Sequence, residues 1–135
     1  MWQSVNKNDK RAVGQFYRDY FHDPEAITEL EPCTPEDFRT NISWFAKIQD
    51  SRLRKLAENV NELWKTLCRK IKPETVAHPS RTSLLLIPDY FIAPGGRFRE
   101  IYYWDTYWIV RGLLVSDMTD TARRMIHNLA GMADR

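Results

Sequence analysis

Apolar residues recur at spacings of three and four along much of this chain, which is the pattern of helices with one buried face. The clearest run predicts a helix from Ser51 to Ile71, and an earlier one predicts a helix from Lys10 to Phe21, capped by Asn8 or a neighbour and ended near Pro24. The later run carries Leu53, Leu56, Ala57, Val60, Leu63, Trp64, Leu67 and Ile71. The pattern therefore favours an all-α fold.

The rest of the chain alternates shorter segments with turn signals. Thr34-Pro35-Glu36-Asp37 predicts the start of a short helix, because a capping residue is followed by Pro at the first helical position and by early acids. Residues 73–81 are expected to be a polar connection, and residues 83–87 a short extended segment ended by Pro88. Two final helices are predicted, one from Trp104 or Tyr107 to Ser116 and one capped by Thr119 or Thr121; the second carries Ala122, Met125, Ile126, Leu129 and Met132.

Composition agrees with a folded domain, since 43% of the residues are hydrophobic and 28% are charged. The net charge of +2 leaves no electrostatic footprint for nucleic acid. No run of apolar residues is long enough to cross a membrane, and no signal peptide follows Met1, so we expect no membrane contact from this segment. The three histidines show no metal-ligand spacing, so neither a metal nor another cofactor is expected.

Two features bear on the cellular compartment. Cys33 and Cys68 are the only cysteines, and so small a number favours reduced thiols over a disulfide framework. Asn41-Ile42-Ser43 is a formal acceptor for N-glycosylation, which is meaningful only if the protein is secreted. The sequence leaves the localisation open.

The segment from Pro94 to Tyr107 combines paired glycines, charges and aromatic rings, a mixture suited to binding a sugar. Gly95 and Gly96 allow a tight turn with positive φ that fixes the direction of Arg97. Arg97 offers only donors and an ionised Asp105 only acceptors, so together they match the hydroxyl groups of a sugar. Trp104 offers a flat face for stacking.

Each of these residues has a plainer interpretation. Arg97 could form a structural salt bridge to Glu100 or Asp105, and the aromatic residues could belong to the core. We assign ligand contact to Trp104, leave Tyr103, Tyr107 and Trp108 mainly to packing, and give Glu100 the role of orienting Arg97; Tyr103 stands with Glu100 as a supporting residue behind the sugar contacts.

Glu100 and Asp105 could instead be a catalytic pair of carboxylates. We disfavour this alternative because the charge of Arg97 would lower both pKa values, whereas a general acid needs a raised pKa.

The sequence Pro94-Gly95-Gly96-Arg97-Phe98-x-Glu100-x-Tyr102-x-Trp104-Asp105-x-Tyr107 resembles a signature motif of the trehalase family. The similarity extends to the flanking runs 83–88 and 107–114 and, upstream, to the spacing of Asp50, Trp64 and Arg69. It implies an inverting α,α-trehalose hydrolase on an (α/α)6 barrel, with sugar contacts at the positions of Arg97, Trp104 and Asp105. Members from animals are often extracellular, which implies an extracellular or membrane-anchored parent protein.

Because 135 residues are too few for such a barrel, the resemblance implies an amino-terminal fragment of one catalytic domain. Residues 1–80 would be outer helices, and residues 81–135 would hold the sugar-site motif and the first barrel hairpin. The family motifs with the catalytic acid and base do not occur here, so no catalytic residue is assigned in this chain. The alternatives are a non-catalytic sugar-binding protein and a helical protein whose stripe along residues 51–71 binds a partner.

Overall fold

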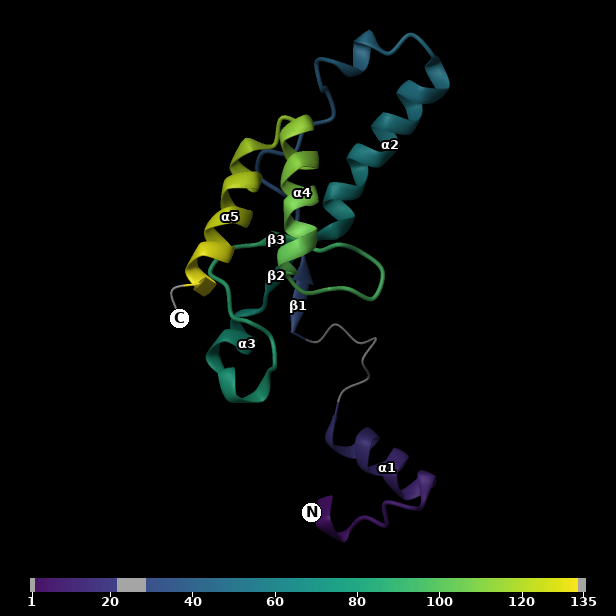
Figure 1. Ribbon diagram of the computed structural model, residues 1–135, viewed down its shortest axis with the longest axis vertical. Helices are drawn as coiled ribbons and strands as arrows, with labels where there is room; N and C mark the ends of the chain where they lie inside the picture. The colour runs from purple at the N-terminus through teal and green to yellow at the C-terminus, as the bar shows by residue number, and fades with distance from the viewer. Residues whose placement is uncertain (1, 22–28, 134–135) are drawn as a thin grey trace.

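A computed structural model describes residues 2–21 and 29–133 of this chain. It is mostly helical, with a small three-stranded sheet below the main helices (Figure 1). The α-helices are α1 (Lys10–Tyr20), α2 (Ser51–Leu67), α3 (Pro73–Ala77), α4 (Tyr103–Val115) and α5 (Thr119–Ala133). The strands are β1 (Leu30–Pro32), β2 (Cys68–Ile71) and β3 (Phe91–Ile92), and single 3₁₀ turns span Trp2–Ser4, Phe45–Lys47 and Pro79–Arg81.

Helices α1 and α2 begin at aspartates that cap them. Asp9, the neighbour of Asn8, accepts a hydrogen bond from the backbone N–H of Arg11 and starts α1, which agrees with the predicted cap at Asn8 or a neighbour. Asp50 caps α2 by accepting hydrogen bonds from the N–H groups of Arg52 and Leu53. These bonds lower the pKa of its carboxyl group, and the bond from Arg52 has the larger effect. The predicted end of the first helix at Pro24 lies outside the described residues.

The prediction of one helix from Ser51 to Ile71 is wrong at its end. The helix stops at Leu67 because Cys68–Ile71 pairs as β2 with both other strands, all antiparallel, in the order β1-β2-β3. The register places Leu30 opposite Ile71 and Cys68 opposite Ile92. Arg69 helps to end the helix, because its Nη1 donates to the backbone oxygens of Thr66 and Cys68, each at 2.7 Å.

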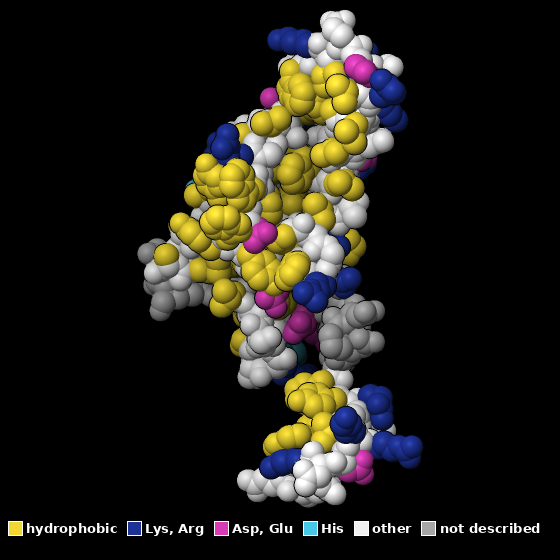
Figure 2. All heavy atoms as spheres, turned by 45° about the vertical axis from the view of Figure 1, so that its right-hand side comes forward, with side chains coloured by type: hydrophobic (Ala, Val, Ile, Leu, Met, Phe, Trp, Pro, Cys, Tyr) yellow, Lys and Arg dark blue, Asp and Glu magenta, His cyan; other side chains and the backbone are white. Residues whose placement is uncertain are grey.

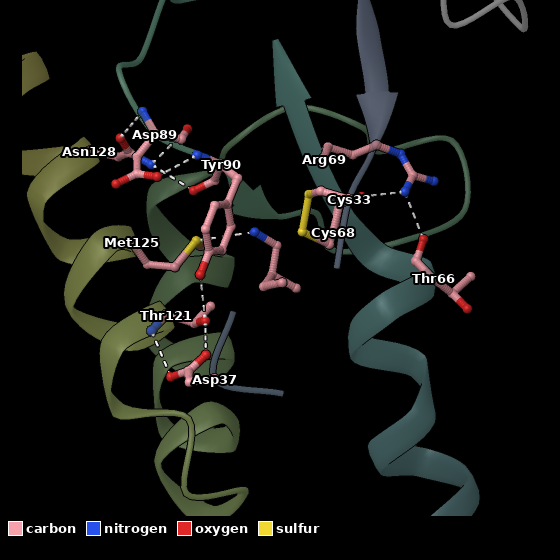
Figure 3. Close-up of a disulfide and its surroundings, with 11 residues drawn as sticks. Cys33, Asp37, Thr66, Cys68, Arg69, Asp89, Tyr90, Thr121, Met125 and Asn128 are labelled. Carbon is pink, nitrogen blue, oxygen red and sulfur yellow. Dashed lines mark hydrogen bonds between the residues drawn. A yellow bond between two sulfur atoms is a disulfide. The ribbon is translucent and has the colours of Figure 1, made fainter. Parts of the chain in front are cut away.

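The cysteines also correct the sequence analysis. Cys33 and Cys68 form a disulfide that ties the end of β1 to the start of β2 (Figure 3). The small number of cysteines favoured reduced thiols. That count contains no information on whether the fold brings the two cysteines together. Strand pairing does that here, since Cys33 N donates to Cys68 O at 3.3 Å.

Three shorter segments differ from the prediction. Residues 34–37 form a single turn rather than a helix, closed by a bond from Phe38 N to Pro35 O, and the Asp37 carboxylate caps the start of α5 instead. The expected polar connection at 73–81 contains α3, which has Pro73 in its first turn. Residues 83–87 carry no strand, and the extended segment is β3, beyond Pro88.

Helices α4 and α5 confirm the two predicted final helices and lie side by side as a hairpin (Figure 1). The connection is a Schellman motif: Met118 N donates to Leu113 O at 2.9 Å, and Asp117 adopts a positive φ of 57°. Both Met118 and Leu113 are fully buried. The expected cap at Thr119 or Thr121 is replaced by a distant one, because Asp37 accepts hydrogen bonds from the N–H groups of Asp120 and Thr121.

The core lies where the sheet meets α5 and the inner side of α4. Ile92 is fully buried, and its N–H donates to the sulfur of Met125 on α5 at 3.2 Å (Figure 3). Asn128, also on α5, holds the chain just before β3 through hydrogen bonds to Asp89 and Tyr90. Among the described helices, none is both long and apolar enough to cross a membrane.

Candidate sugar-binding site

The turn that precedes α4 has the backbone that its glycines predict. Gly95 and Gly96 have φ values of +112° and +58°, and Phe98 N donates to Gly95 O at 3.1 Å to close the turn. A Cβ at Gly95 would lie 3.2 Å from the side chain of Leu67, so the turn also approaches the end of α2 closely. The predicted role of the glycine pair in shaping this turn is confirmed.

Arg97 stands in this turn with its guanidinium exposed. Its Cζ lies 5.1 Å from the centroid of the Phe98 ring, a cation–π contact that sets its direction. Within the described part of the chain, Arg97 has no ion pair with a carboxylate, so the structural salt bridge to Glu100 or Asp105 is not formed. Its donors are therefore available to a ligand.

Glu100 does not bond to Arg97 in this structure. Its side chain is exposed and borders a small cavity of about 50 Å³ lined also by Leu84 and Ile101. The role of Glu100 in orienting Arg97 therefore stays a prediction.

The first turn of α4 presents the other two predicted contacts. The helix starts where Tyr102 O accepts hydrogen bonds from Thr106 N at 3.0 Å and from Thr106 Oγ1 at 2.6 Å. Trp104 is 75% exposed, whereas Asp105 beside it is half-buried. A carboxylate in the first turn of a helix is favoured by the positive end of the helix dipole, which keeps Asp105 a good acceptor.

An apolar groove of about 490 Å³ lies on α4 and α5. Trp104 lines this groove, but Arg97 and Asp105 do not, so the three predicted sugar contacts do not enclose a single cavity. The groove is lined by Tyr103, Trp104, Thr106, Tyr107, Trp108, Val110, Arg111, Ile126 and Leu129. Figure 2 shows how widely apolar side chains are exposed on one face of the molecule.

The aromatic residues assigned to packing are exposed instead. Tyr103 is 84% exposed, and Tyr107 and Trp108 remain 57% and 56% exposed on the same helix. These three side chains were expected mainly to pack in the protein, but the described residues do not cover them. Whether Tyr103 supports the sugar contacts stays a prediction.

Arg111 was not among the predicted site residues. It lines the groove one turn after Tyr107, donates from Nη1 to the Tyr107 hydroxyl at 3.4 Å, and lies 5.8 Å from the centroid of that ring. The spacing of four residues on one helix is the signal that could have found this pair.

Helix α2 fixes the position of α4 through Trp64. The indole Nε1 donates to Ser116 Oγ at 2.9 Å, and a Cβ at Gly112 would come within 3.0 Å of the indole ring. Only a glycine allows this close approach without displacing the ring. Trp64, one of the upstream residues in the family spacing, thus braces the helix that carries Trp104 and Asp105.

Comparison with known proteins agrees with the motif. The sequence pattern of the family described as Trehalase matches residues 1–135. The chain belongs to the trehalase family. It is 48% identical over 124 residues to the trehalase of Oryctolagus cuniculus, an alignment that covers 91% of this chain and 21% of that protein.

Relatives from other animals give the same picture. Identity is 45% over 120 residues to the trehalase of Bombyx mori and 47% over 100 residues to that of Homo sapiens. These alignments cover 89% and 74% of this chain but 20% and 17% of the relatives. The chain therefore spans about a fifth of the length of the curated relatives it matches, and the resemblance read from the motif is confirmed.

Proposed function

We propose that this chain provides part of the sugar-binding site of an enzyme that hydrolyses α,α-trehalose to glucose. The observation that carries the proposal is the turn at Gly95 and Gly96, in which the guanidinium of Arg97 is exposed and forms no ion pair with any described carboxylate, shortly before the exposed Trp104. An exposed guanidinium that forms no ion pair within the described ranges and an exposed indole face, both in the segment that leads into and begins α4, suit a polyol ligand. Membership of the trehalase family names the disaccharide.

Each residue has a distinct role in this proposal. Arg97 donates hydrogen bonds to sugar hydroxyls, Asp105 accepts hydrogen bonds from them, and Trp104 stacks on the apolar face of one glucose unit. Glu100 and Tyr103 support these contacts from behind and orient the guanidinium when the ligand is bound.

The chemistry itself is assigned to carboxylates outside these 135 residues. In an inverting glycosidase one carboxylic acid protonates the bridging oxygen while a carboxylate activates water on the opposite face of the sugar. No cofactor is needed for this reaction. The isolated chain is accordingly expected to release no glucose from trehalose.

The exposed apolar faces fit the larger fold that we propose, an (α/α)6 barrel. Leu53, Leu56 and Leu63 on α2 are each about half-exposed, as is much of α4. Helices of such a barrel bury their apolar stripes against neighbouring hairpins, so these faces would be covered by further helices. In that arrangement α4 and α5 form the first hairpin, and the groove on them faces the rest of the domain.

Trehalose binding tests the assignment of residues. We would measure it by calorimetry on the protein that carries this chain, comparing Arg97→Lys, Asp105→Asn and Trp104→Ala. Arg97→Lys keeps the charge but loses the planar fork, so affinity should fall roughly 10-fold or more. Asp105→Asn and Trp104→Ala should weaken binding by a similar factor, because a charged acceptor or a stacking face is lost.

Two controls separate binding from structure. Arg123→Lys changes an exposed arginine of α5 that pairs with Asp120, and it should leave trehalose affinity unchanged. Trp108→Ala removes an exposed indole one turn along the same helix as Trp104, and it should weaken binding less than Trp104→Ala does. Equal losses for both tryptophans, or unchanged affinity in Arg97→Lys, would contradict the assigned contacts.

A further inference from the structure

The loop from Phe38 to Trp44, which joins the turn after β1 to the 3₁₀ turn before α2, carries the only N-glycosylation acceptor sequence of the chain, Asn41-Ile42-Ser43. Both Asn41 and Ser43 are exposed, whereas Ile42 between them is 3% exposed and anchors the loop. The buried isoleucine thus holds the two polar residues at the surface. We propose that Asn41 is an N-glycosylation site of this protein.

The local geometry suits this modification. Ile42 N donates to Thr40 O at 3.2 Å, so Asn41 occupies the centre of a tight three-residue turn. Within the described ranges, the side chains of Asn41 and Ser43 have no hydrogen-bond partner in the protein. An amide nitrogen that is exposed and unbonded can act as the acceptor without breaking any contact of the fold.

The loop is nevertheless well positioned by its neighbours. Asn61 on α2 donates from Nδ2 to Arg39 O at 2.9 Å on one side of the acceptor sequence. Trp44 donates from Nε1 to Val115 O at 2.9 Å on the other. A glycan would therefore grow outward from a fixed point rather than from a flexible tail.

The disulfide supplies an independent argument about the compartment. Both cysteines of the chain are joined, and Cys68 is fully buried, so the bond is a structural one rather than an exposed reactive pair. Structural disulfides form and persist in the oxidising secretory compartment and outside the cell. N-glycosylation takes place in that same compartment. The disulfide therefore supports entry into the secretory pathway, which the acceptor sequence requires.

The position of Asn41 is compatible with the proposed sugar site. The bond from Trp44 to Val115 places the loop at the carboxyl end of α4, whereas Trp104 and Asp105 lie in its first turn. With a rise of about 1.5 Å per residue, the two ends of this helix are about 18 Å apart. A glycan at Asn41 would thus leave the end of α4 that carries the motif open.

The modification is a group transfer from an oligosaccharide carried on a lipid diphosphate. The Asn41 amide nitrogen forms a bond to the anomeric carbon of the first sugar, and the bond from that carbon to the diphosphate oxygen breaks. The amide nitrogen releases one proton, and the lipid diphosphate is the leaving group that takes up this proton. A transferase of the secretory compartment catalyses the step, so this chain provides only the acceptor.

Peptide mass analysis of the protein isolated from its own source tests the proposal. Trypsin without prior reduction would release residues 40–47 with Asn41 as the only asparagine, and a linked pair of peptides, 19–39 and 66–69, if the disulfide is present. We expect the linked pair, and we expect peptide 40–47 to carry hexose and N-acetylhexosamine mass that an N-glycan amidase removes, leaving aspartate at position 41. Peptide 56–65 is the internal control, because Asn59 is exposed but precedes no acceptor serine or threonine and should stay asparagine.

The proposal is overturned if peptide 40–47 is recovered only in its unmodified form, whether or not the disulfide is present. Expression through the secretory pathway of a eukaryotic cell gives a second test that does not depend on one variant folding. Asn41→Gln and Ser43→Ala should both lose the glycan mass, whereas Ser43→Thr should keep it. A glycan that persists in Asn41→Gln would place the modification elsewhere and reject Asn41.

Discussion

The corner where the sheet meets α5 and the outer face of α4 use similar side chains in opposite ways. In the corner, Tyr90 is 8% exposed and its hydroxyl shares a hydrogen bond of 3.1 Å with Thr121, whose hydroxyl in turn donates to Asp37 (Figure 3). On α4, Trp104 and Tyr103 lie mostly in solvent. Polar and aromatic groups that satisfy one another stabilise the fold, whereas groups left unsatisfied are available to a ligand or to further helices.

The charged residues show the same contrast. Arg124 on α5 donates to Asp89 at 2.6 Å and to Glu36 at 2.8 Å, and its pKa is raised chiefly by the hydrogen bond to Asp89. Among the described residues, Arg97 contacts the ring of its neighbour Phe98 and forms no ion pair. Because a paired arginine is already committed, the unpaired one is the better candidate for binding.

The largest expected effect comes from removing the disulfide of the corner. Cys33→Ser combined with Cys68→Ser frees a loop of 35 residues in sequence separation, and the loss of loop constraint in the unfolded chain should lower the free energy of unfolding by about 3–4 kcal/mol. Urea unfolding followed by circular dichroism measures this loss. Treatment of the oxidised wild type with a reductant should lower its free energy of unfolding by about the same amount. Equal urea midpoints for the oxidised wild type and the double variant would contradict a stabilising role of the disulfide.

A smaller loss is expected from Asp37→Ala, which removes the acceptor at the start of α5. The N–H groups of Asp120 and Thr121 would lose their acceptor, and the buried Thr121 hydroxyl would lose one partner while keeping Tyr90, so the free energy of unfolding should fall by about 2 kcal/mol. Urea unfolding measures this change.

The adjacent Glu36→Gln is the matched control for Asp37→Ala. The Glu36 side chain is 72% exposed and forms an ion pair with Arg124, so the loss should stay within about 0.5 kcal/mol. A larger effect for Glu36 than for Asp37 would mean that the cap across the turn contributes little.

The cap formed by Asp37 also shows which features could not be predicted from the sequence. The periodicity of α2, α4 and α5 and the glycine turn are local features, and the sequence predicts them well. Asp37 caps a helix that starts more than 80 residues later, and a sequence window cannot detect such a partner. The helix predicted from residues 34–37 does not form, and Asp37, which was expected only as an acid in its first turn, caps α5 instead.

The sheet was missed for a related reason. Its strands span two to four residues, too few for an alternating pattern to be recognised, and β2 continues the apolar stripe of α2 through Ile71. The disulfide depends on that strand pairing, so it was not predicted either. At the candidate site, the residue types followed from the motif, but the exposure of Tyr107 and Trp108 depends on what covers α4 and could not be read from composition.

The cap of helix α2, Asp50, allows a test of how its charge contributes to stability at different pH values. The hydrogen bonds from the N–H groups of Arg52 and Leu53 lower the pKa of Asp50 in the folded state below 3.8, so its contribution to stability is present above that pH and is lost as the pH falls through the folded-state pKa. A carboxyl titration followed by NMR should give a midpoint below 3.8 for Asp50. The difference in urea midpoint between wild type and Asp50→Ala should shrink at the acid end, and a constant difference would show that charge plays no part in this cap.

The smallest effect on stability is expected at Trp104, where the effect on sugar binding should be large. Because the indole is 75% exposed, Trp104→Ala removes little buried area and should change the free energy of unfolding by less than about 0.5 kcal/mol. Tyr90→Ala, which deletes an aromatic ring that is 8% exposed, should cost about 3 kcal/mol or more in the same urea experiment. If Trp104→Ala destabilised the protein as much as Tyr90→Ala, the ring would be part of the core in solution, and its loss of trehalose affinity could no longer be attributed to stacking.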